Sequence, residues 1–449
     1  MLIVILGAGV VGTQIASQLI EEGKDVVIIE RNKERAKYVS ARLDCIVINE
    51  EGTNIASLKN ADMDKADIFI SVTNSDEVNM IACALVASEF GNVKTKIARV
   101  RNLDYSETKI IDKPFFGIDY VVNTEVETAR KIAHTVALGA ASDVVLFENT
   151  DLQMRNIQVA EDSLFKDKQI KDLHNYIKEP FLIAGIVSNN SFVIPSGDTV
   201  INKDDILYLL SSPYDFAKMF AHSDRRKSKR ISSIILAGGG EIGFLVCRYL
   251  ANTGRKITLI EIDYELCKVL AEKFPDVLVI NADISAEETF TEENLGSYDL
   301  IIAATDNQEL NILTSVYAKH IGVKHSISLV TNSNYIPIAA QLDIDSTIST
   351  KLSTVDAIMK YIRKGDIKSV NSIFDGKAEV IEFSIDDDNI MGHKLLRDIK
   401  LPPDTLVLSV VRKKRSYLPD GNFMILPGDV VIIISGKESI AQLEEFFLD

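Results

Sequence analysis

Short apolar runs alternate with helical stretches in the N-terminal part of the chain. The strands predicted from these runs cover residues 2–6, 26–29, 45–48, 68–72 and 96–100, of which the last reads KIARV and also contains Lys96 and Arg99. Runs of four or five apolar residues favour buried strands, and the longer stretches between them favour helices. This alternation predicts a parallel β-sheet with right-handed crossovers, in which helices cover the sheet.

The period of the pattern changes after this region. Over residues 123–141 the apolar side chains fall on one face of a predicted helix, at Val126, Ala129, Ile132, Ala133, Val136, Ala137 and Ala140. Short apolar runs at 181–187 and 206–210 then predict a small β-rich unit over residues 143–221. We therefore expect a connecting helix between a large lobe and a small one.

The same series of patterns occurs twice in the chain. A glycine fingerprint begins at Gly7 and again at Gly238, 231 residues later, and an acidic residue stands 23 positions after each start, at Glu30 and Glu261. Further pairs recur at offsets of 232 or 224: Thr73 with Thr305, Asn79 with Asn311, Pro195 with Pro419, and Asp205 with Asp429. The offset drifts by only a few residues, so the chain is an internal duplication.

Each half is thus predicted to be a Rossmann-like α/β domain with a parallel sheet, followed by a small α+β lobe. The expected segments of the first half are an N-lobe at 1–122, a connecting helix at 123–142 and a C-lobe at 143–221. A linker at 222–230 follows. The second half repeats the order with an N-lobe at 231–350, a helix at 351–375 and a C-lobe at 376–449.

Composition narrows the possible partners. The net charge of −16 over 449 residues would repel a phosphate backbone, so nucleic acid is not an expected partner. No apolar stretch reaches the 18 residues that a membrane span needs.

The linker at 222–230 carries five basic residues, which fit either a solvated hinge or a contact with anionic lipid or phosphate. The four cysteines form no CxxC pair, and we expect them to be reduced in a cytoplasmic protein.

The glycines carry the first chemical signal. Gly7 permits the tight turn after the first strand, Gly9 lets a pyrophosphate approach the backbone, and Gly12 permits close packing of helix on strand. Glu30 would then accept hydrogen bonds from the ribose of an adenine nucleoside. The second copy repeats this arrangement with Gly238, Gly240, Gly243 and Glu261.

The two acidic residues also bear on which nucleotide fits. Glu30 and Glu261 disfavour a 2′-phosphate, so NAD(H) or an adenine nucleotide fits better than NADP(H). Arg31, next to Glu30, weakens this discrimination in the first copy.

Further polar positions follow the other strands of the first copy. Gly52 and Thr53 follow the third strand, Thr73 and Asn74 follow the fourth, and Arg99 lies in the fifth. In open α/β sheets ligands bind at these carboxyl ends. Arg99 is a candidate for holding a phosphate, and an ion pair with a neighbouring carboxylate is the alternative. Its counterpart in the second copy is Leu329, so we expect the two sites to differ.

Candidate catalytic residues do not recur between the two copies as the glycines do. The six histidines form no recurring constellation and have no metal-ligand spacing. A dehydrogenase would need a proton donor or acceptor beside the nicotinamide, and the small lobes repeat Pro/Gly turns instead. The sequence therefore favours binding without turnover.

Several motifs together resemble a known family. The double glycine fingerprint, the stretches "VTNSDEVNMIAC", "TKIARVRNLDY" and "IKLPPDTLVLSVVRKKRSYLPDGNFMILPGDVV", and the four-part order are similar to those of the TrkA subunits of bacterial Trk potassium uptake systems. These subunits contain two tandem RCK (regulator of K⁺ conductance) units, each with a nucleotide-binding KTN N-lobe and a C-lobe. The resemblance covers essentially the whole chain.

The resemblance implies ligand positions by motif match. In the first copy they are Gly7, Ala8, Gly9, Val10, Val11, Glu30, Glu51, Gly52, Thr73, Asn74 and Arg99. In the second copy they are Gly238, Gly239, Gly240, Glu241, Ile242, Glu261, Asp283, Thr305 and Asp306. The turn after the third strand departs from the family pattern of Gly-Asp/Asn-Gly-Ser/Thr, because residues 50–53 read EEGT and residues 282–285 read ADIS. The additional carboxylate would disfavour highly charged ligands at the first site.

The function implied is regulation of potassium uptake. A subunit of this kind would bind NAD(H), with ATP or ADP as further ligands, and would gate a membrane subunit of the TrkH type from the cytoplasmic face. It would assemble into a ring, with four chains and eight RCK units, through the apolar faces of the two connecting helices. An NAD-dependent oxidoreductase and a nucleotide sensor without a channel are the alternatives.

Overall fold

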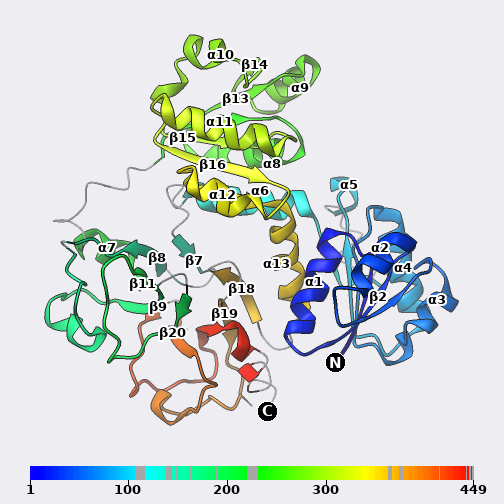
Figure 1. Cartoon of the computed structure of the whole chain (residues 1–449), viewed down its shortest axis with the longest axis horizontal. Helices are drawn as coiled ribbons and strands as arrows, with labels where there is room; N and C mark the ends of the chain where they lie inside the picture. The colour runs from blue at the N-terminus through cyan, green and yellow to red at the C-terminus, as the bar shows by residue number, and fades with distance from the viewer. Residues whose placement is uncertain are drawn as a thin grey trace. The chain divides into compact units, whose positions relative to one another are not determined.

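The structure is a computed structural model that describes most of the chain. The described residues are 1–106, 117–137, 144–147, 150, 152–161, 163–188, 191–219, 231–362, 367–373, 378–387, 389–413, 415–440, 442–443 and 446. The chain forms two compact units, one from Met1–Ser142 with Ser228–Ile358 and one from Asp143–Lys227 with Met359–Asp449. The first unit contains two parallel sheets and the second contains two antiparallel sheets (Figure 1). The predicted linker at 222–230 lies outside the described residues.

The first parallel sheet has six strands in the order β3-β2-β1-β4-β5-β6. Its strands are β1 (Leu2–Leu6), β2 (Asp25–Ile29), β3 (Ile46–Ile48), β4 (Ile68–Ser71), β5 (Thr95–Arg99) and β6 (Tyr120–Val122). The helices between them are α1 (Val10–Glu21), α2 (Lys33–Ser40), α3 (Ile55–Asn60), α4 (Asp76–Glu89) and α5 (Leu103–Ser106). The strand order reverses between β1 and β4, which places a crevice at the carboxyl ends of these two strands.

Local sequence explains where the helices of this sheet begin. Asn32, Asn54 and Ser75 each accept a hydrogen bond from a backbone N–H in the first turn of α2, α3 and α4. Four of the five residues of β1 are buried, because helices cover both faces of a doubly wound sheet.

The second parallel sheet repeats this topology in the order β14-β13-β12-β15-β16-β17. Its strands are β12 (Ser233–Ala237), β13 (Lys256–Glu261), β14 (Leu278–Asn281), β15 (Leu300–Ala303), β16 (His325–Val330) and β17 (Ser346–Ser349). The helices are α8 (Glu241–Leu250), α9 (Tyr264–Lys273), α10 (Glu287–Glu292), α11 (Gln308–His320) and α12 (Tyr335–Gln341). The predicted α/β fold with two parallel sheets is confirmed.

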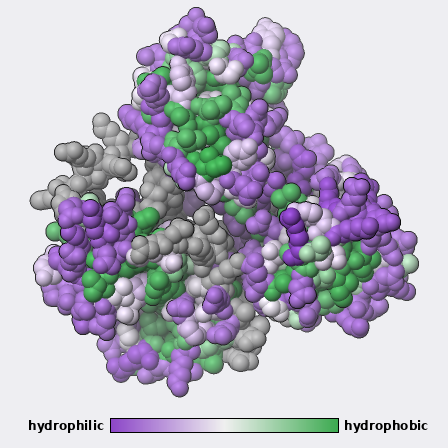
Figure 2. Space-filling model, in the orientation of Figure 1, coloured by the Kyte–Doolittle hydropathy of each residue, from purple (hydrophilic) through white to green (hydrophobic). Residues whose placement is uncertain are grey.

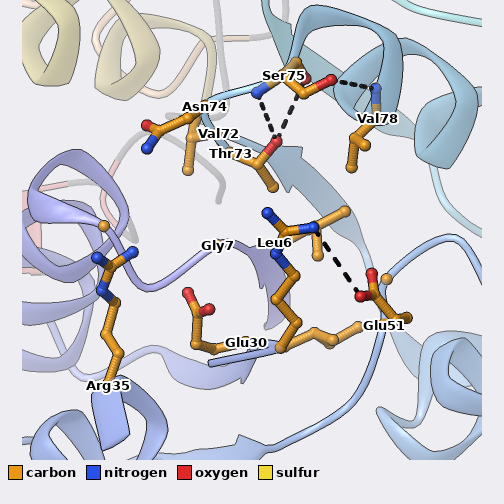
Figure 3. Close-up of a pocket in the computed structure, with 14 residues that line it drawn as sticks. Leu6, Gly7, Glu30, Arg35, Glu51, Val72, Thr73, Asn74, Ser75 and Val78 are labelled. Carbon is orange, nitrogen blue, oxygen red and sulfur yellow. Dashed lines mark hydrogen bonds and ion pairs between the residues drawn. The ribbon is translucent and has the colours of Figure 1, made fainter. Parts of the chain in front are cut away.

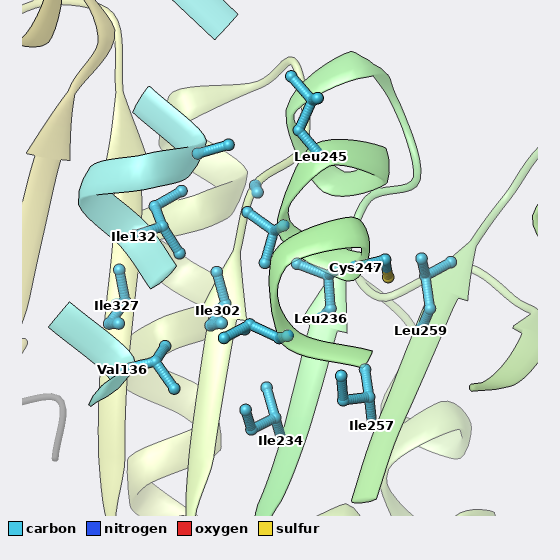
Figure 4. Packing of buried hydrophobic residues seen from close by; sticks show 14 of the residues in the cluster. Ile132, Val136, Ile234, Leu236, Leu245, Cys247, Ile257, Leu259, Ile302 and Ile327 are labelled. Carbon is cyan, nitrogen blue, oxygen red and sulfur yellow. The ribbon is translucent and has the colours of Figure 1, made fainter. Parts of the chain in front are cut away.

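The connecting helix of the first half packs on the sheet of the second half. This helix, α6 (Thr124–Ala137), buries Ile132 and Val136 in one cluster with Ile302 and Ile327 of the second sheet (Figure 4). It also contacts α13 (Thr350–Ile362), where Thr354 Oγ1 donates to Thr124 Oγ1 at 3.0 Å. The apolar face that the sequence assigned to ring assembly is therefore covered within the chain.

The second unit consists of two antiparallel sheets with matching topologies. The first, in the order β10-β9-β11-β8-β7, contains β7 (Val144–Leu146), β8 (Gln153–Gln158), β9 (Leu182–Ser188), β10 (Ser191–Val193) and β11 (Ile206–Ser211), and α7 (Pro213–Met219) follows. The second, in the order β18-β19-β22-β20-β21, contains β18 (Ile367–Ile373), β19 (Ala378–Ser384), β20 (Thr405–Arg412), β21 (Arg415–Tyr417) and β22 (Val430–Gly436). Met154 and Leu210 share a buried cluster with Val380 and Ile432, so the two sheets share a core.

Apolar side chains remain exposed on one face of the second parallel-sheet domain. Leu313 on α11 is 67% exposed, and Ile338 and Leu342 on and after α12 are also exposed. Figure 2 shows apolar side chains gathered over α11. The two helices pack on each other through Ile312 and Ala339.

In the described part of the chain, no helix is both long and apolar enough to span a bilayer.

Candidate nucleotide site

The glycine loop after β1 leaves space at one glycine and none at another. Gly7 has a φ of +105°, which favours glycine in the turn that leaves the strand. A Cβ atom on Gly9 would meet no other atom within 4 Å, whereas one on Gly12 would lie 2.0 Å from the Gly7 carbonyl oxygen. The loop is thus open at Gly9 and closely packed at Gly12, as the fingerprint predicts.

The second copy has the same loop geometry. Gly238 has a φ of +102°, Gly240 borders open space, and a Cβ atom on Gly243 would lie 2.1 Å from the Gly238 carbonyl oxygen. Gly9 and Gly240 are the N-cap residues of α1 and α8, and no side chain caps either helix. The N–H groups of the first helical turn are therefore available to an anion such as a pyrophosphate.

A carboxylate held by backbone N–H groups stands beside each glycine loop, and it is buried in the first copy and partly buried in the second. Glu30 is buried at the end of β2, where Oε2 accepts a hydrogen bond from the Ala8 N–H at 2.8 Å and Oε1 accepts one from the Asn32 N–H at 2.8 Å. Glu261 accepts the corresponding bonds from Gly239 and Asp263 at 2.6 and 2.9 Å. Each oxygen keeps a further lone pair, which can accept a ribose hydroxyl.

The predicted residues of the first copy come together around one pocket of about 230 Å³ (Figure 3). Gly7, Gly9, Glu30, Glu51, Gly52, Thr73 and Asn74 line this pocket, together with Leu6, Ile29, Arg31, Arg35, Val72, Ser75 and Val78. In Figure 3, Thr73, Asn74 and Ser75 lie on one side of the cavity, and Glu30, Arg35 and Glu51 lie on the other. The residues present fit an adenine nucleotide, since they offer an open phosphate loop and an anchored carboxylate.

Other predicted positions of the first copy are not among those lining residues. Ala8 contributes its N–H to Glu30, and Val11 is buried in the first turn of α1, whereas Val10 is 55% exposed. Thr53 follows Gly52 but does not line the pocket. Their direct contact with a ligand stays a prediction.

Arg99 is also absent from the lining. Its Nε donates a hydrogen bond to Thr124 Oγ1 at 3.0 Å, at the start of α6. Burial lowers the pKa of Arg99, and the nearby carboxylate of Glu125 acts in the opposite direction. Arg99 and Leu329 hold equivalent strand positions, because each carbonyl accepts a hydrogen bond from the repeated asparagine, at 2.7 and 3.0 Å. A phosphate contact of Arg99 stays a prediction.

The repeated asparagine fixes the turn that follows the fourth strand. Asn79 is fully buried, and its Oδ1 accepts hydrogen bonds from the N–H and the hydroxyl of Thr73 at 2.8 and 2.7 Å. Asn311 makes the same two bonds to Thr305, at 2.9 and 2.6 Å. The repeated Thr/Asn pairs therefore hold the turn that carries the predicted ligand residues.

Sequence reasoning missed two features of the site. Arg35 lines the first pocket from the first turn of α2, and no motif in the sequence indicates it. Asn49 donates hydrogen bonds to the carbonyls of Glu30 and Arg31, and Asn281 repeats these bonds 232 residues later. The same offset that pairs Asn79 with Asn311 could have identified this second asparagine pair.

The second site contains more carboxylates around its loop. Asp283 accepts hydrogen bonds from the N–H and hydroxyl of Ser285, which lower the pKa of Asp283. Glu241 begins α8; burial raises the pKa of Glu241, and the carboxylates of Glu125 and Asp306 contribute to the increase. Asp306 follows Thr305 at the carboxyl end of β15, and Ile242 is the second residue of α8. Among the described residues, no group of acidic, His or Cys side chains is arranged to hold a metal ion.

Family models match most of the chain. The TrkA-N domain matches residues 3–124 and 234–350, and the TrkA-C domain matches residues 154–222 and 380–448. The chain is 30% identical over 447 residues to a "Trk system potassium uptake protein TrkA homolog" of Archaeoglobus fulgidus, with all of both chains covered. It is 29% identical over 454 residues to the TrkA protein of Halomonas elongata, covering all of this chain and 98% of the relative.

Solved structures share the fold. The crystal structure of the GsuK RCK domain superposes with a TM-score of 0.56 at 16% identity, covering 99% of this chain and 94% of that one. The GsuK channel bound to NAD gives the same TM-score and identity, covering 99% of this chain and 78% of that one.

Proposed function

The chain belongs to the TrkA family, and on that premise we propose that it is a regulatory subunit of a potassium uptake system, which binds nucleotides without turning them over. The nucleotides are NAD(H), with ATP or ADP as further ligands. The membrane partner is a potassium-translocating protein of the TrkH type, on whose cytoplasmic side the chain acts. In this division the N-lobes are residues 1–122 and 231–350, and the C-lobes are residues 143–221 and 376–449. The predicted connecting helix at 351–375 is too long, because α13 ends at Ile362 and β18 (Ile367–Ile373) pairs with β19 in the sheet of the second C-lobe.

One observation carries this proposal: the same phosphate loop and anchored carboxylate occur twice. Gly9 and Gly240 border open space at uncapped helix N-termini, and Glu30 and Glu261 are each held by two backbone N–H groups. Both features suit a nucleotide with a pyrophosphate and a free ribose. Two such sites in one chain fit a regulator that binds two different nucleotides, or two molecules of the same nucleotide.

Gating would follow from a difference in nucleotide affinity between two conformations of the protein. A ligand shifts an equilibrium only by as much as it prefers one state over the other. Moving the population from 1:99 to 99:1 requires about a 10⁴-fold preference for the favoured state. The nucleotide that activates uptake would therefore bind the open state of the assembly more tightly than the closed state.

Assembly with further chains would use a surface other than the connecting helices. Leu313, Ile338 and Leu342 expose apolar side chains on and beside α11 and α12. By contrast, Ile132 and Val136 of α6 and Val355 and Ile358 of α13 are already buried within the chain. We assign the ring contact, with four chains to the ring, to the exposed face. Replacing Leu313 and Ile338 by Asp should lower the mass measured by light scattering while nucleotide binding is retained.

Calorimetric titration with NADH, NAD⁺, ATP and ADP tests the binding part of the proposal. The wild-type chain should bind at least one of them, and the Gly9→Val and Gly240→Val variants should each lose one site. A decrease in NADH absorbance during incubation with a candidate substrate would indicate an oxidoreductase instead. Failure to co-purify with a Trk-type membrane protein would favour a sensor without a channel.

A further inference from the structure

Two arginines line the first pocket next to the ribose-binding carboxylate. Arg31 directly follows Glu30, and Arg35 lies in the first turn of α2. Both side chains line the pocket together with Glu30 and Glu51. In Figure 3 the carboxylate of Glu30 lies between Arg35 and Glu51 on the same side of the cavity. From the sequence, only Arg31 of this pair is expected to affect the choice of nucleotide.

Both guanidinium groups are available to a ligand. Arg31 Nη1 lies 4.0 Å from Glu51 Oε1, and the two side chains are 74% and 61% exposed, so their pairing is weak. Within the described part of the chain, nothing forms a hydrogen bond or an ion pair with the Arg35 guanidinium, whose backbone N–H donates to Asn32. A phosphate could therefore bind either arginine without breaking a strong internal contact.

The second copy has no cation at the equivalent positions. Ile262 follows Glu261 as Arg31 follows Glu30, and Leu266 stands where the first copy has Arg35. Ile262 is 68% exposed, and Leu266 packs against the buried core of its own domain. With Asp283 in the place of Glu51, this end of the second site carries two carboxylates and neither arginine.

The position of these arginines identifies the part of the ligand that they would contact. The phosphates of a dinucleotide bind at the N-terminus of α1, whereas the carboxylate at the end of β2 receives the adenosine ribose. Glu30 is held there by the N–H groups of Ala8 and Asn32. The side chains of Arg31 and Arg35 thus border the ribose end of the pocket, away from the pyrophosphate.

We propose that the first site, contrary to the expectation from its carboxylates alone, also accepts an adenosine whose ribose carries a 2′-phosphate, as in NADP(H), and that the second site rejects it. This inference rests on the proposed nucleotide binding. At the first site the two guanidinium groups balance the charges of Glu30 and Glu51, so the added phosphate gains charge-assisted hydrogen bonds. At the second site the same phosphate meets Glu261 and Asp283, and the positions equivalent to the two arginines hold Ile262 and Leu266.

The test compares ligands that differ only in the 2′-phosphate. The full-length Gly240→Val variant reports the first site, and the full-length Gly9→Val variant reports the second. Each is titrated by calorimetry with the pairs AMP and 2′,5′-ADP, and NADH and NADPH. We expect the 2′-phosphate to leave the Kd within about tenfold at the first site and to weaken it by roughly a hundredfold at the second.

Substitutions then assign the effect to the arginines. Arg31→Ile and Arg35→Leu copy the second site into the first, and each should weaken 2′,5′-ADP by roughly tenfold while AMP changes much less. Arg42→Leu is the matched control, because this exposed arginine follows α2, lies over the Tyr38 ring and does not line the pocket. Ile262→Arg should recover part of the lost NADPH binding at the second site.

The outcomes separate the two proposals. If neither AMP nor NADH binds either variant, the proposed function is wrong and the inference fails with it. If AMP and NADH bind but the 2′-phosphate raises the Kd by the same factor at both sites, the inference alone is overturned. Equal effects of Arg42→Leu and Arg35→Leu would show a general charge effect and would likewise overturn it.

Discussion

The buried Asn79 should be needed both for the stability of the first domain and for the shape of its site. Its side chain forms hydrogen bonds with Ser71, Thr73 and the carbonyl of Arg99, at 2.7–3.2 Å. Asn79→Ala leaves the Thr73 N–H and the Arg99 carbonyl without their side-chain partner. An unpaired buried group costs about 1–3 kcal/mol, and these two groups are only partly buried, so we expect the free energy of unfolding to fall by about 2–4 kcal/mol.

Asn79→Ala should also weaken binding at the first site, because Thr73 and Asn74 line the pocket from the turn that Asn79 holds. Thermal unfolding followed by circular dichroism measures stability, and calorimetry with NADH measures binding. Asn311→Ala is the matched variant, since Asn311 makes the same contacts with Thr305 and Leu329 in the second domain. It should affect only the second site. Unchanged melting of Asn79→Ala, or a loss of binding at the second site instead of the first, would refute the reasoning.

Three further predictions concern other parts of the first unit. Gly9→Val should abolish binding at the first site and keep the melting temperature, whereas Gly12→Ala should lower the melting temperature because its Cβ would collide with the Gly7 carbonyl. Asp299→Asn should cost about 1–3 kcal/mol at pH 7. Burial raises the pKa of Asp299, but hydrogen bonds from Lys324, Ser232 and Ser233 outweigh this effect and lower it. The stabilisation by Asp299 is fully present above the unfolded-state pKa of about 4, and it is lost as the pH falls through the lower folded-state pKa. Denaturation measured from pH 7 to 2 should therefore show that the difference in the free energy of unfolding between wild type and variant becomes smaller. Val136→Asp should unfold the second parallel-sheet domain instead of merely dissociating a ring, and light scattering combined with circular dichroism will distinguish the two.

Most strands of the first sheet could be predicted from the sequence, because buried parallel strands are continuous apolar runs. The predicted run at 96–100 differs by one residue from β5 (Thr95–Arg99). The last strand of each sheet was missed. The β6 strand has three residues, and β17 (Ser346–Ser349) reads STIS, so neither has the apolar signal of an inner strand. Only the pairing with the neighbouring strand in the structure identifies them as strands: Arg99 pairs with Val122 and Leu329 pairs with Ile348.

The residues that pack against α6 could not be predicted from the hydrophobic pattern of α6 itself. The apolar periodicity correctly indicates that Ile132 and Val136 are buried, but it does not indicate by what. Their partners, Ile302 and Ile327, lie more than 160 residues further along the chain. Such a contact depends on how the two halves pack, which periodicity within one helix does not encode.

The glycine loop and its carboxylate could be predicted because their chemistry is local. Gly7, Gly9, Gly12 and Glu30 act through backbone geometry and a fixed spacing, and the structure gives each glycine the geometry expected. The orientation of Arg99 could not be predicted in this way. Its guanidinium is set by Thr124 at the start of α6, which lies 25 residues away in the sequence.

Potassium flux into vesicles that contain a Trk-type membrane protein tests the central claim most directly. The flux should be measured with and without this chain, each in the presence and absence of NADH, NAD⁺, ATP and ADP. We predict that at least one nucleotide changes the flux only when the chain is present. A double variant with Gly9→Val and Gly240→Val should bind the membrane protein but give a flux that no nucleotide alters. If the wild-type chain binds nucleotide and membrane protein and the flux stays the same under all conditions, the proposal of a gating subunit is wrong.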